Sequence, residues 1–110
     1  MAIHHALSGE LIDIRPLLGK LKNARTQALY KSDQLEVFRM VLPAGKSTPA
    51  HQVAGEISIQ CLEGSVELTA AGTSQLMRQG DLICLAGGER HALKAIDDSS
   101  VLVTVLLHRK

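Results

Sequence analysis

Residues 56–70 read EISIQCLEGSVELTA, two short stretches in which apolar and polar residues alternate on either side of a glycine. Because successive side chains of a β-strand point to opposite faces, each stretch is expected to bury one face and expose the other. Glu63-Gly64 is typical of the tight turn that joins such strands. In the first strand the row expected to face the interior is Ile57, Ile59 and Cys61, and the opposite row is Glu56, Ser58 and Gln60.

The same pattern continues outward along the chain. Short runs rich in Val, Ile, Leu and Thr are separated by clusters of Gly, Asp, Ser and Pro, which is the signature of an all-β fold. A short helix is also expected at Pro16–Lys22, with Pro16 in its first turn and Gly19 weakening it. The expected strands are Glu10–Ile14, Ala24–Tyr30, Leu35–Leu42, Glu56–Leu62, Ser65–Ala70, Ser74–Arg78, Leu82–Leu85, His91–Ile96 and Val101–Leu107.

Length and composition describe one ordinary globular domain. A chain of 110 residues with 45% hydrophobic residues can build one core, which we divide into N-terminal strands and an arm at 1–34 and a barrel core at 35–107. The formal net charge is +1, and no basic cluster or aromatic platform suits nucleic acid. No segment is apolar enough to span a membrane, so we expect a cytoplasmic protein. Cys61 and Cys84 lie in apolar runs and are expected to be free, buried thiols.

The last expected strand indicates that the protein has a partner subunit. Val101–Leu107 is apolar on both parities except for Thr104, so both of its faces are expected to be covered. A subunit interface would supply the second cover, which predicts a homodimer.

Two segments resemble the two motifs of the cupin superfamily. In the first, GKSTPAHQVAGEISIQCLEG at 45–64, the matching positions are Gly45, His51 and Gly64. In the second, GDLICLAGGERH at 80–91, they are Gly80, Gly88 and His91. The resemblance implies a double-stranded β-helix, or jelly-roll barrel, usually dimeric, with a ligand pocket inside the barrel mouth. The strand pattern agrees with that all-β barrel.

The resemblance also shows what is missing. A metal-binding cupin holds its ion with three histidines and one glutamate, and only His51 and His91 match that set, while Val53 and Ile57 stand at the other two positions. Glu56 could replace the glutamate only if its strand carried a bulge, and Gln60 is a weaker candidate of the same parity. Two histidines could still bind zinc, nickel, iron or copper with water or a ligand completing the shell. They could equally bind a small molecule without metal.

Further candidates surround this pair. Ile57 and Ile59 are expected to line the pocket, and Arg39 either projects into it toward a carboxylate or faces water. His4, His5 and His108 have no ligand spacing to other residues and are expected on the surface.

Three functions stay open at this stage. The first is a barrel that binds a small polar or anionic molecule in its central pocket. The second is a metal-dependent enzyme of the dioxygenase, isomerase or decarboxylase type. The third is a dimeric interaction module.

Overall fold

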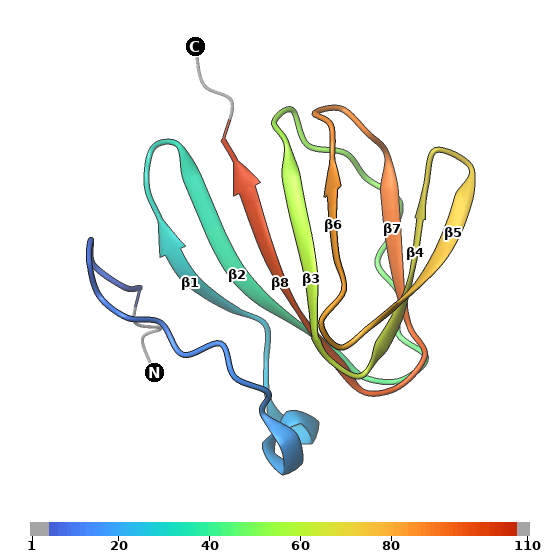
Figure 1. Cartoon of the computed structure of the whole chain (residues 1–110), viewed down its shortest axis with the longest axis horizontal. Coiled ribbons are helices and arrows are strands. Elements are labelled where there is room, and N and C mark those ends of the chain that lie inside the picture. The colour runs from blue at the N-terminus through green and yellow to red at the C-terminus, as the bar shows by residue number, and fades with distance from the viewer. Residues whose placement is uncertain (1–4, 108–110) are drawn as a thin grey trace.

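The structure is a computed structural model that describes residues 5–107. Within that range the chain forms one 3-10 helix and eight strands, all paired antiparallel (Figure 1). The elements are η1 (Leu18–Asn23), β1 (Gln27–Lys31), β2 (Leu35–Leu42), β3 (Ile57–Glu63), β4 (Ser65–Ala70), β5 (Thr73–Arg78), β6 (Leu82–Leu85), β7 (His91–Ala95) and β8 (Ser99–Leu106). The all-β jelly-roll architecture predicted from the sequence is confirmed.

Two sheets enclose the core. One has the strand order β1-β2-β8-β3-β6 and the other β5-β4-β7. The inward row of β3 is the predicted one, since Ile59 is 1% exposed, and it packs with Val66 and Leu68 of β4 and Val103 of β8. The apolar parity of each strand therefore builds a single core between the sheets.

The turn between β3 and β4 requires glycine. Gly64 has a φ of +81°, and a Cβ there would collide with the Asp98 carbonyl oxygen and the Ser99 hydroxyl. Only a residue without a side chain fits both the left-handed backbone and the close approach of β8.

The N-terminal segment differs from its predicted form. Residues 10–14 make no strand, and residues 5–26 instead run as an arm beside β1 (Figure 1), against the outer face that carries Arg39. The Ala6 N–H donates to the Leu29 carbonyl at the edge strand β1. The predicted helix is a 3-10 helix displaced toward the C-terminus, because Leu18 adopts a φ of +54° that ends any regular helix before it.

Two other predictions change in part. Cys61 is fully buried, and burial raises the pKa of its thiol, but Cys84 is exposed because it points outward from the edge strand β6. Both thiols are free. On the outer face of β8, Leu102 and Thr104 are half-buried and Leu106 is 47% exposed, so that face is only partly covered. No helix among residues 5–107 is long and apolar enough to cross a membrane.

Candidate ligand-binding site

His51 and His91 meet at one end of the barrel, as the two motifs predicted. His51 lies in the loop between β2 and β3, and His91 is the first residue of β7. Their backbones form an isolated antiparallel bridge, with N–H to O distances of 3.0 Å from His51 to His91 and 2.8 Å in return. The bridge brings the two ring centroids to 4.5 Å at an interplanar angle of 53°.

The two rings are oriented by the same kind of contact. Nδ1 of His51 lies 3.2 Å from the Pro49 carbonyl oxygen, and Nδ1 of His91 lies 3.0 Å from that of Glu89. A carbonyl can only accept, so Nδ1 carries the proton in each ring, and in the neutral imidazole Nε2 keeps its lone pair. Each Nε2 can thus accept a hydrogen bond or ligate a metal, and it belongs to an exposed side chain in His51 and to a buried one in His91.

A cavity of about 410 Å³ opens beside His51, and we call it the mouth cavity. Its wall is mainly apolar, and Ile57 contributes to it as predicted, whereas Ile59 lies deeper in the core. The backbone approaches closely here, since a Cβ on Gly55 would collide with the Leu106 carbonyl oxygen. Apolar lining is supplied by Phe38, Val53, Ala54, Ile57, Val105 and Leu107.

Glu36 also lines the mouth cavity, and the sequence reasoning missed it. It shares the parity of Phe38 on β2, a signal that would have placed it on the inner face. Its carboxylate is 3.9 Å from the Lys31 ammonium. The mouth cavity therefore combines one carboxylate and one imidazole in an apolar wall.

The other predicted metal ligands do not join the pair. Glu56 is exposed just before β3, and Gln60 is half-buried on the outer face of the sheet. Within residues 5–107, no three His, Cys, Asp or Glu side chains are placed to hold a metal ion. The four-ligand metal site of cupins therefore does not fit this chain, and two histidines could hold an ion only with donors from water or a bound molecule. His5 is exposed, whereas His4 and His108 lie outside the described residues.

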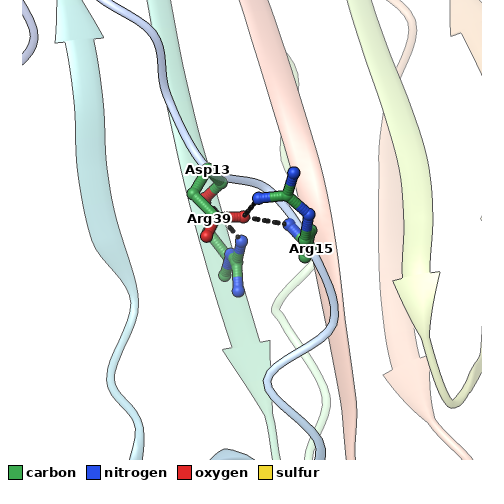
Figure 2. Close-up of polar contacts among 3 residues, drawn as sticks. All are labelled: Asp13, Arg15 and Arg39. Carbon is green, nitrogen blue, oxygen red and sulfur yellow. Dashed lines mark hydrogen bonds and ion pairs between the residues drawn. The ribbon is translucent and has the colours of Figure 1, made fainter.

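Arg39 lies far from its predicted place in the pocket. It belongs to the outward parity of β2 and is covered by the N-terminal arm, so that it is only 5% exposed (Figure 2). Its Nη2 donates to the Asp13 carbonyl oxygen at 3.1 Å. The prediction that Arg39 enters the barrel pocket is wrong, and the alternative is right about the outer face but wrong about exposure to water, because the N-terminal arm covers this face.

Glu63 is the second residue that the sequence reasoning missed. A bulge between Cys61 and Glu63 turns its side chain to the outer face beside Ser100. There the carboxylate accepts from the Leu17 N–H at 2.8 Å, the Leu18 N–H at 3.0 Å and the Ser100 hydroxyl at 2.8 Å. Burial disfavours its charged form, but these hydrogen bonds and the Arg39 charge outweigh burial and hold the pKa of Glu63 below its usual value. Glu63 therefore clamps the arm to the sheet.

These features define a class: a jelly-roll barrel with a histidine pair at its mouth. The sequence pattern of the cupin domain matches residues 38–107. The chain belongs to the cupin family.

Solved structures show the same fold. A conserved protein of unknown function from Streptococcus pyogenes is 19% identical over 100% of this chain and 98% of its own, with a TM-score of 0.78. A cupin superfamily protein from Desulfitobacterium hafniense is 22% identical over 89% and 95%, with a TM-score of 0.76. A DMSP lyase from Ruegeria pomeroyi is 25% identical over 74% of this chain and 45% of its own, with a TM-score of 0.66. No curated protein sequence matches the chain.

Proposed function

We propose that this cupin binds a small molecule in the mouth cavity, with the His51–His91 pair as its polar anchor. The observation that carries the proposal is the paired geometry of the two rings, which contact each other while both Nδ1 atoms are tied to backbone carbonyls. Side chains held in this way are preorganised, so a ligand would not have to order them. His51 links the pair to the cavity because it lines the cavity wall.

The lining of the mouth cavity narrows the class of ligand. A volume of about 410 Å³ lies in the lower part of the range of small-molecule sites. Of the lining residues within 5–107, none is Lys or Arg and one is a carboxylate, Glu36, which disfavours an anion. The ligand proposed here is a small neutral molecule with an apolar body and a hydroxyl or amino group that donates to Nε2.

Thermal-shift and calorimetric titrations with C4–C8 alcohols test this proposal. Wild-type protein should bind a subset of these probes, and His51→Ala should weaken binding about tenfold, the loss expected for one hydrogen bond. His91→Ala should also weaken it, because it removes the ring that packs against His51. His5→Ala is the matched control, since His5 is an exposed histidine outside the mouth cavity. Equal binding by all four proteins, or none by the wild type, would reject the proposal.

A metal-dependent enzyme is the second candidate. It is supported by the backbone anchoring of both Nδ1 atoms, which is the usual arrangement behind metal-binding histidines. A bound zinc, nickel, iron or copper ion would supply Lewis-acid chemistry at the barrel mouth. Elemental analysis of untagged protein purified without chelator decides between the candidates: stoichiometric metal that is lost in His51→Ala and His91→Ala favours the enzyme, and metal-free protein favours direct binding.

The homodimer also stands as a proposal. Leu82 and Leu102 both pair with Gln60 across the outer face of the five-stranded sheet, and Leu82 is 61% exposed there. A second copy of the chain would cover this apolar row. The cytoplasmic location stays a prediction from composition.

A further inference from the structure

A second cavity lies on the other side of the five-stranded sheet from the mouth cavity. It has a volume of about 900 Å³ and is enclosed between the N-terminal arm and the outer face of β1 and β2. The mouth cavity is lined from β2 by Glu36 and Phe38, whereas this arm cavity is lined from β2 by Arg39. The sheet itself separates the two.

Arg39 is the buried charge of the arm cavity. Its guanidinium lies beneath the arm, where Nη2 bonds the Asp13 carbonyl oxygen (Figure 2). Among the described residues, Nη1 is buried and has no hydrogen-bond partner. A buried charged donor without an acceptor is costly, and a guanidinium is shaped to bind two oxygens at once.

The nearby carboxylates are already engaged. The Asp13 carboxylate accepts from the Arg15 N–H at 2.9 Å and pairs with Arg15 Nη1 at 3.3 Å. Both Glu63 oxygens bond the arm backbone and Ser100. Nη1 of Arg39 therefore lacks an acceptor among residues 5–107, and an oxygen of a bound molecule could fill that role.

The rest of the arm cavity suits an acidic ligand. Four basic side chains line it against two acidic ones, Glu10 and Asp13. The basic residues other than Arg39 are Arg15, Lys20 and Arg25, all exposed, so they can approach a bound anion without being desolvated themselves. Leucine and isoleucine side chains of the arm and β1 supply apolar wall.

We propose that the arm cavity binds a small organic anion, whose carboxylate or phosphate oxygen accepts from Arg39 Nη1 and whose apolar body lies along the arm. Arg15, Lys20 and Arg25 balance the remaining charge. Because Nη1 is covered, the bound oxygen reaches it by displacing the arm around Asp13. Neither the histidine pair nor the proposed mouth ligand takes part, so this site stands independently of the proposed function.

Calorimetry with two anions of equal chain length, hexanoate and hexyl phosphate, tests the site at low ionic strength. Wild-type protein should bind at least one of the two anions in the arm cavity, and the stronger anion identifies the head group. Arg39→Gln should weaken that binding by about tenfold or more, because a charge-assisted pair is lost. Arg25→Gln should weaken it about threefold, since it removes only an exposed charge.

Two further variants locate the anion. Arg78→Gln, an exposed substitution on β5 outside the cavity, should bind as the wild type does. His51→Ala should also keep anion binding, and its loss there would place the anion in the barrel mouth and overturn the proposal. Failure of both anions to bind the wild type would overturn it too, as would unchanged affinity in Arg39→Gln. If Arg39→Gln does not fold, the exposed double variant Arg15→Gln/Arg25→Gln carries the test, and unchanged affinity there overturns the proposal.

Discussion

Replacing Glu63 by glutamine should loosen the N-terminal arm and destabilise the whole domain. The carboxylate accepts two arm N–H groups and the Ser100 hydroxyl, and the residue is 7% exposed. Glutamine keeps the shape, but its amide NH₂ group faces a donor, so at least one of the hydrogen bonds from the Leu17 and Leu18 N–H groups is lost. Losing a hydrogen bond to a charged acceptor, together with the weakening of the others, costs about 3 kcal/mol.

This loss of unfolding free energy corresponds to a decrease in melting temperature. For a domain of this size, about 4 °C is lost per kcal/mol, so Glu63→Gln should melt about 12 °C below the wild type at neutral pH. Circular dichroism measures the melting curve, and hydrogen exchange of the Leu17 and Leu18 amides should accelerate in the variant. Glu67→Gln, an exposed change of the same kind on β4, is the control and should shift stability by less than about 0.5 kcal/mol. Equal melting temperatures for the two variants would refute the clamp.

Three further predictions follow from the same structure. The stability gap between wild type and Glu63→Gln should narrow as the pH falls from neutral to strongly acidic, because a carboxyl with a lowered pKa stabilises the fold only while it is ionised; a constant gap in urea titrations would contradict this. Ile59→Ala, at a position 1% exposed, should cost about 3 kcal/mol in urea unfolding, whereas Ile96→Ala, 49% exposed, should cost less than about 1 kcal/mol; equal costs would contradict the core assignment. Leu102→Asp should halve the mass measured by light scattering, and a mass equal to that of wild type would reject the proposed dimer face.

The barrel could be predicted from the sequence because its strands bury one parity each. The expected bounds of Leu35–Leu42, Ser65–Ala70 and Leu82–Leu85 match β2, β4 and β6. These strands alternate cleanly or lie between strong turn residues, so local pattern and tertiary burial agree. The two histidines were predicted together because both motifs place them at the same end of the barrel.

The arm and its contacts could not be predicted in the same way. Residues 10–14, ELIDI, are rich in Leu and Ile like a strand, and nothing local shows that they lie against the outer face of the sheet instead of pairing with its edge. Glu63 has the inward parity of Ile59, and only the bulge in β3 turns it outward. Arg39 lies on the outer face as its parity indicates, but its burial depends on an arm whose contacting residue, Asp13, lies 26 residues earlier in the chain. Long-range covering of this kind leaves no periodic signal in the sequence.

The central claim, that the histidine pair anchors a ligand in the mouth cavity, is tested most directly by NMR. Long-range ¹H–¹⁵N spectra report His51 and His91 Nε2, and methyl spectra report Val53, Ile57 and Val105 of the cavity wall. Titration with a C4–C8 alcohol that binds the wild type should shift both Nε2 resonances together with these methyl groups. Binding that shifts the methyl groups and leaves both Nε2 resonances unchanged would show a ligand held without the histidines, and would contradict the account.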